Sequence, residues 1–127
     1  MKRILVLGPI NDGTVVSQNK MKKYAEIQRK KGNAVYLPGE DANQDARAYD
    51  FTVEVLSQIE WSEEVHVFCD PGSKTFIFYL GMVFALKKKI EVIENVLFEK
   101  DGKSIPETLS EWQKEQDKPV KQLVLDL

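Results

Sequence analysis

The stretch that decides the fold runs Val65-His66-Val67-Phe68-Cys69-Asp70-Pro71-Gly72-Ser73. Five residues typical of a buried strand lead directly into a polar turn, and the apolar residues that follow predict a helix over about 75–88. A strand that ends in a polar turn before a helix is the usual way in which an α/β domain presents a ligand site.

The chain also opens with this pattern. The aliphatic run Ile4-Leu5-Val6-Leu7 ends at Gly8-Pro9 and predicts a strand buried on both faces of a parallel sheet. Further strands are expected at 34–37, 90–93 and, as an edge strand, 120–125. Helices are expected at 19–31, 41–61 and 104–118, the last on the surface because its apolar content, Leu109 and Trp112, is thin, and a small hairpin is expected at 96–105.

Alternating strands and helices place the chain in the α/β class. We expect a flavodoxin- or Rossmann-like three-layer sandwich with a mostly parallel sheet of four or five strands, by default in the order 2-1-3-4-5. The length of 127 residues and the 43% hydrophobic share suit one domain with a single core, spanning 1–127. Residues 93–127 form a C-terminal extension of that domain.

Composition excludes several classes of function. The net charge of −2 argues against a nucleic acid polymer as partner. One cysteine and one histidine exclude an internal disulfide and argue against structural zinc or a Ser/His/Asp site, so we expect no metal and no cofactor. No apolar run approaches a membrane span, and Gly8-Pro9 interrupts the first one, so we expect a cytoplasmic protein without a membrane partner.

Two glycine-bearing loops form the predicted ligand site, because the carboxyl ends of the first and third strands are neighbours in this fold. The hydroxyl groups of Ser73 and Thr75 begin a helix, where they and the free N–H groups favour an anion such as phosphate, with added charge from Lys74. The alternative is that Ser73 merely caps the helix. The candidate binding residues are Gly8, Pro9, Asn11, Asp12, Gly13, Gly72, Ser73, Lys74 and Thr75.

Three further side chains have both a functional and a structural interpretation. The carboxylate of Asp70 would enter the same crevice as an acid, a base or a sugar-hydroxyl acceptor, or would only accept N–H bonds of the turn. Tyr79, one helical turn beyond the loop, would line the pocket or pack. His66 shares a strand face with Phe68 and Asp70, and we expect a core histidine there rather than a catalytic one.

The helix at 76–86 is apolar on every side. So short a chain has few layers with which to cover such a helix, which predicts a homodimer or higher homo-oligomer through this helix. The alternative is a central helix covered by its own chain.

Several short motifs together resemble the nucleoside 2-deoxyribosyltransferase family, which includes the deoxynucleoside 5′-monophosphate N-glycosidases. They are residues 2–9, 32–38, 65–70, Gly72-Ser73 and 80–90, so the resemblance covers about residues 1–93. It implies that the Gly8-Pro9 loop receives base and sugar and that Ser73 holds a 5′-phosphate. In this family a glutamate nucleophile precedes Leu-Gly, and here Tyr79 precedes Leu80-Gly81. A phenol with a pKa near about 10 is a poor nucleophile at neutral pH.

Three hypotheses follow from these residues. The first, which we favour, is a nucleotide- or nucleoside-binding module of the deoxyribosyltransferase type that is degenerate in catalysis. The second is an active N-glycosidase or deoxyribosyltransferase with a relocated carboxylate, in which Asp70 acts as nucleophile or acid and Tyr79 as a hydrogen-bond donor. The third is a non-enzymatic, oligomeric interaction domain.

Overall fold

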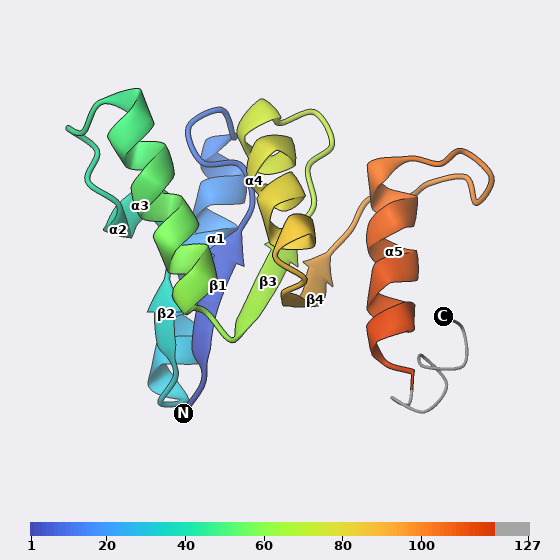
Figure 1. Cartoon of the computed structure of the whole chain (residues 1–127), viewed down its shortest axis with the longest axis horizontal. Coiled ribbons are helices and arrows are strands. Elements are labelled where there is room, and N and C mark those ends of the chain that lie inside the picture. Colours follow the sequence, from blue (N-terminus) through green and yellow to red (C-terminus); the bar gives the residue numbers. More distant parts are fainter. Residues whose placement is uncertain (119–127) are drawn as a thin grey trace.

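The sheet has four parallel strands in the order β2-β1-β3-β4 (Figure 1). The computed structural model describes residues 1–118. The strands are β1 (Arg3–Leu7), β2 (Ala34–Tyr36), β3 (Glu64–Phe68) and β4 (Lys89–Glu94). This architecture confirms the α/β class and the first four positions of the expected strand order. The edge strand expected at 120–125 lies outside the described residues.

Helices cover both faces of the sheet. They are α1 (Val15–Lys30), α2 (Pro38–Asp41), α3 (Ala48–Trp61), α4 (Lys74–Ala85) and α5 (Ile105–Gln116). In Figure 1, α3 and α4 lie in front of the sheet and α1 lies behind it. One apolar core joins the sheet to α3, α4 and α5, and a second, smaller core joins it to α1. Of the helices in residues 1–118, none is long and apolar enough to cross a membrane.

Strand β3 faces both cores and is buried along its whole length. Its odd-numbered residues Val65 and Val67 belong to the core beneath α3 and α4. Its even-numbered residues Glu64 and His66 face the side of α1, and Phe68 joins the core on that side. His66 is therefore a buried histidine with hydrogen-bond partners, as expected.

Two helices begin at residues other than those expected. Helix α1 starts at Val15 rather than at Asn19, because the hydroxyl of Thr14 accepts a hydrogen bond from the backbone N–H of Ser17 and caps the helix earlier. The helix expected over 41–61 is divided into α2 and α3.

A loop at residues 42–47 causes that division. The side-chain amide of Gln44 donates to the carbonyls of Pro38 and Ala42, and Glu54 accepts from the backbone N–H of Asn43. These side-chain hydrogen bonds compete with the backbone hydrogen bonds of a helix, as polar side chains near turns often do. As a result, the loop lies across the top of α3 at the carboxyl edge of the sheet.

The region after β4 corrects two expectations. Residues 95–104 contain no strand, so the predicted hairpin is wrong; the chain turns there through Lys103 at φ 51°. Helix α5 also does not lie loosely on the surface, because Leu109 is fully buried.

Helix α5 also covers the outer edge of β4. The side chain of Gln116 bonds both the N–H and the carbonyl of Ile90, and Gln113 Oε1 accepts from the N–H of Val92 at 2.7 Å. Two glutamines thus take the place of a neighbouring strand.

Candidate functional site

The two glycine-bearing loops meet at the carboxylate of Asp12. Asp12 accepts from the hydroxyls of Ser73 and Thr75, both at 2.7 Å, and from the backbone N–H groups of Lys74 at 2.8 Å and Thr75 at 3.3 Å. The hydrogen bonds from Ser73 and Thr75 are the main cause that lowers the pKa of Asp12 to about 2. The donors expected to hold an anion therefore hold a carboxylate of the same chain.

These contacts also fix the loops to each other. The hydroxyl of Ser73 accepts from the N–H of Phe76 at 3.1 Å, so Ser73 caps α4 and donates to Asp12 at the same time. The hydroxyl of Thr75 accepts from the N–H of Ile10 at 3.0 Å. Each hydroxyl donates one hydrogen bond and accepts another. Together these bonds link the loop after β1 to the start of α4.

A pocket of about 510 Å³ opens beside this junction, between the loop after β1, the start of α3 and the start of α4. Tyr79 is buried at its wall and donates a long hydrogen bond, 3.5 Å, to the hydroxyl of Thr52. Among the described residues, none that lines this pocket carries a charge. The lining residues are Ile10, Asn11, Gln44, Ala46, Ala48, Phe51, Thr52, Thr75 and Tyr79.

Asp70 lies in a different pocket. That pocket, of about 270 Å³, is lined by Asp70 with Pro9, Lys20 and Glu94 among others, whereas Tyr79 lines the pocket of about 510 Å³. Asp70 Oδ1 accepts from the N–H of Gly72 at 3.0 Å, as a carboxylate does in a turn. The structure therefore does not bring Asp70 and Tyr79 together.

The glycines of the first loop serve close packing. A side chain at Gly8 would meet Met21 Sδ at 2.4 Å, and one at Gly13 would meet Pro9 Cβ at 2.7 Å. Gly8, Pro9 and Asn11 also line a separate pocket of about 370 Å³ on the side of α1. Gly72 and Lys74 line a shallow depression with Phe78 instead. Of the nine candidate binding residues, Asn11 and Thr75 share a pocket with Tyr79.

Sequence reasoning missed Gln44, Phe51 and Thr52, which form a whole side of the pocket of about 510 Å³. The apolar spacing at 41–61 predicts a helix but not its buried face: Tyr49 and Val53, which fit that spacing, are exposed, whereas the buried residues of α3 are Val55 and Ile59. The same pattern therefore gave no reason to single out Phe51 and Thr52.

No protein-family model matches the chain, and no curated protein sequence is significantly similar to it. The solved structures that are similar to it include two 2-deoxyribosyltransferases. A 2-deoxyribosyltransferase from Leishmania mexicana has a TM-score of 0.58 and 16% identity, covering 76% of this chain and 66% of that one, just under two thirds. The 2-deoxyribosyltransferase from Bacillus psychrosaccharolyticus has a TM-score of 0.56 and 15% identity, covering 94% of each chain. This chain shares the α/β fold of the 2-deoxyribosyltransferases.

Proposed function

We propose that this chain binds a nucleoside or nucleotide in the pocket beside Tyr79 and does not cleave it. The observation that carries the proposal is the pocket itself, which lies at the carboxyl ends of β1 and β3, where ligands bind in this fold, and has an uncharged lining. The similar Bacillus protein is described as a biocatalyst for nucleoside synthesis. The family resemblance implies that Tyr79 stands at the position of a glutamate nucleophile, and a phenol there would favour binding without catalysis.

The lining suits the uncharged part of such a ligand. Phe51 offers an aromatic surface to a base, and Asn11, Thr52 and Thr75 offer polar groups to base edges or sugar hydroxyls. A 5′-phosphate has less support, because Asp12 already occupies the donors at the start of α4 and would repel a second anion. We therefore propose that nucleosides bind more tightly than their 5′-monophosphates.

Calorimetric titration of the full chain with a panel of nucleosides and their monophosphates tests this proposal. Replacing Thr52 with Val removes the hydroxyl but keeps the shape, and we expect nucleoside binding to weaken up to about 10-fold. Thr108→Val is the matched control, because Thr52 and Thr108 both donate to a carbonyl four residues back in their helices. Failure of every nucleoside to bind, or equal affinities in the two variants, contradicts the proposal.

The catalytic alternative has its own test. Asp70 lies beside Glu94 in the second pocket, and two carboxylates are what glycoside chemistry uses. Release of free base from any nucleoside or deoxynucleotide, abolished by Asp70→Asn, would show that the chain is an enzyme. We expect no base release at any tested ligand concentration.

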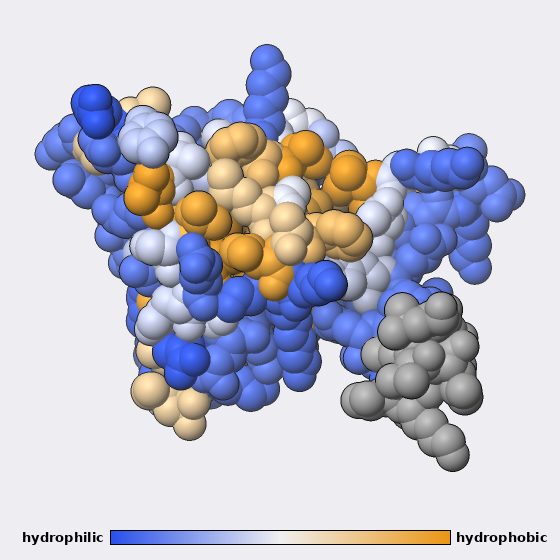
Figure 2. All heavy atoms as spheres, in the orientation of Figure 1, coloured by the Kyte–Doolittle hydropathy of each residue, from blue (hydrophilic) through white to orange (hydrophobic). Residues whose placement is uncertain are grey.

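We also propose that a second copy of the chain covers the exposed side of α4. Figure 2 shows hydrophobic side chains gathered over α4 and the neighbouring α3 on one face of the molecule. Phe78 and Phe84 are 54% and 59% exposed, and Tyr49 and Val53 of α3 are exposed beside them. Apolar patches of this kind mark interfaces.

Light scattering after size-exclusion chromatography tests the self-association. Phe78→Lys should shift the protein to a smaller species, because a buried unpaired charge opposes association. Ile27→Lys, a matched change at an exposed position of α1 on the other face, should leave the assembly unchanged. A monomeric wild-type protein would refute this part of the proposal.

A further inference from the structure

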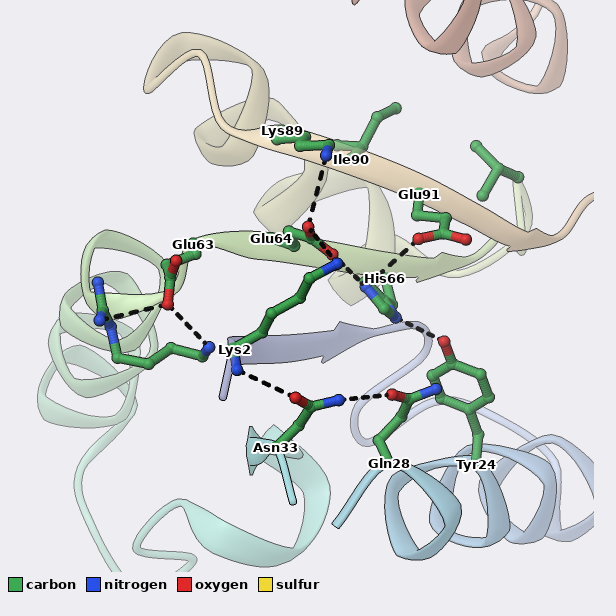
Figure 3. Close-up of polar contacts among 12 residues, drawn as sticks. Lys2, Tyr24, Gln28, Asn33, Glu63, Glu64, His66, Lys89, Ile90 and Glu91 are labelled. Atoms are coloured by element: carbon green, nitrogen blue, oxygen red, sulfur yellow. Dashed lines mark hydrogen bonds and ion pairs between the residues drawn. The ribbon is translucent and has the colours of Figure 1, made fainter. Parts of the chain in front are cut away.

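Two neighbouring strands bring together a set of metal-ligand side chains on the face of the sheet near α1. Glu64 and His66 come from β3 and Glu91 from β4, and strand register places Glu91 directly opposite His66. One ligand atom from each residue lies within 4.8 Å of the other two. Figure 3 shows both carboxylates turned toward the imidazole ring. This cluster is separate from the proposed nucleoside pocket, to which none of the three residues contributes.

The cluster is unusual for its place in the fold. Glu64 is 6% and His66 4% exposed, on a strand with neighbours on both sides. Interior strands of parallel sheets are normally almost entirely apolar, as Val65 and Val67 are here. Burying ionisable groups is costly unless they are well paired, so two of them on one strand face call for an explanation.

The geometry around Nε2 of His66 supplies an explanation for the buried ionisable pair. His66 Nε2 lies 3.0 Å from Glu64 Oε1 and 3.7 Å from Glu91 Oε2. A neutral imidazole carries at most one proton on Nε2, and that proton makes one good hydrogen bond. The carboxylate of Glu91 therefore receives no good hydrogen bond from this nitrogen, whereas one metal ion could bind His66 Nε2 and an oxygen of each carboxylate.

The contact of the other ring nitrogen, Nδ1, favours metal binding by Nε2. His66 Nδ1 lies 2.5 Å from the hydroxyl of Tyr24, which reaches the ring from α1 (Figure 3). A hydroxyl can accept the hydrogen bond of an Nδ1–H. In that tautomer Nε2 carries no proton and is free to bind a metal, and a metal-binding histidine usually donates its other N–H to an outer partner in this way.

Two lysines hold the far oxygen of Glu64. Lys2 and Lys89 lie 3.1 Å and 3.5 Å from Oε2, which leaves Oε1 facing His66. The two ammonium groups favour the ionised form of this carboxylate, which a metal ligand must have, and they also reduce its affinity for a cation.

We propose that Glu64, His66 and Glu91 bind a divalent transition-metal ion, with Zn²⁺ the best match to one imidazole nitrogen and two carboxylate oxygens. Ligand atoms in a tetrahedral zinc site lie about 3.4 Å apart, so atoms that are up to 4.8 Å apart must move closer together by as much as about 1.4 Å. Glu91 makes this movement, because its side chain is 54% exposed and free to rotate. Its exposure also leaves room for water to complete the coordination.

Nuclear magnetic resonance of the imidazole tests the proposal directly, because His66 is the only histidine of the chain. The protein is used full length, without a histidine tag and after treatment with a chelator, and is titrated with Zn²⁺. We expect the Nε2 resonance to shift in a saturable, one-to-one manner and the proton to reside on Nδ1. Unchanged ring resonances at saturating Zn²⁺ overturn the proposal.

Matched variants identify the ligands. Glu91→Gln should weaken Zn²⁺ binding by at least about 10-fold, whereas Glu94→Gln, at a similarly exposed position of the same strand, should not change it. Tyr24→Phe removes the outer partner of the histidine and should weaken binding by about 10- to 100-fold. Because Glu91 lies at the surface, its variant folds regardless of the cluster, and equal affinities of the Glu91 and Glu94 variants contradict the assignment.

Discussion

The two faces of β3 achieve burial in opposite ways. Toward α3 and α4, Val65 and Val67 pack in an apolar core with Phe76. Toward α1, Glu64 and His66 are also buried but are held by hydrogen bonds and ion pairs. The comparison teaches that stability on the first face depends on filled volume, whereas on the second it depends on a complete set of partners.

The largest effect is expected on the apolar face. Phe76→Ala removes a fully buried ring and should lower the free energy of unfolding by about 3–5 kcal/mol, measured by urea denaturation. Phe78→Ala on the same helix is the control, because that ring is 54% exposed and should cost far less. Similar losses for the two variants would show that volume does not decide stability here.

The polar face should respond to loss of a partner. His66→Ala removes the hydrogen bonds to Glu64 and Tyr24 and should cost about 1–3 kcal/mol in the same assay. His66→Gln retains a donor and an acceptor and should cost less. If the alanine and glutamine variants were equally stable, hydrogen bonding would not be what holds this face.

The pH dependence of stability separates the faces further. The pKa of Glu64 falls from its usual value of 4.5 to about 2 in the folded protein, so the ionised carboxylate stabilises the fold. This contribution is complete above about pH 4.5 and is lost as the pH falls toward 2, by at most about 1.4 kcal/mol per pH unit. Urea denaturation from neutral to acid pH should show a shallower slope for Glu64→Gln than for the wild type.

Two tyrosines, Tyr79 buried and Tyr24 partly buried, provide the smallest test. Tyr24 is bonded to His66 at 2.5 Å on the polar face, whereas Tyr79 donates to Thr52 at 3.5 Å on the apolar face. Tyr24→Phe should cost about 1 kcal/mol of unfolding free energy and Tyr79→Phe clearly less, since the longer bond is weak. A larger loss of unfolding free energy for Tyr79→Phe than for Tyr24→Phe would contradict this expectation.

The sequence predicted the fold well because local signals agree with the final packing. The aliphatic run at 4–7 and the strand–turn–helix pattern after Val65 became β1, β3 and α4. Strand order followed from the alternation of strands and helices. The division of the expected helix at 41–61 was missed because side-chain bonds from Gln44, rather than periodicity, decide it.

The polar sites were harder to predict because they depend on register and on loop docking. Glu91, His66 and Tyr24 lie far apart in the chain and become neighbours only when α1 packs on the sheet. The alternation Glu64-Val65-His66 beside Ile90-Glu91-Val92 was a signal that could have placed them on one face. No sequence pattern indicated that the carboxylate of Asp12 would accept the hydrogen bonds offered at the start of α4.

The glutamines of α5 that cover the outer edge of β4 have a consequence for colloidal stability. An open strand edge is a template for adding strands from other molecules, and here Gln113 and Gln116 occupy its backbone groups. They occupy them only while α5 is docked. Transient local unfolding of α5 would therefore expose backbone groups of β4 that can pair with another molecule, which favours aggregation.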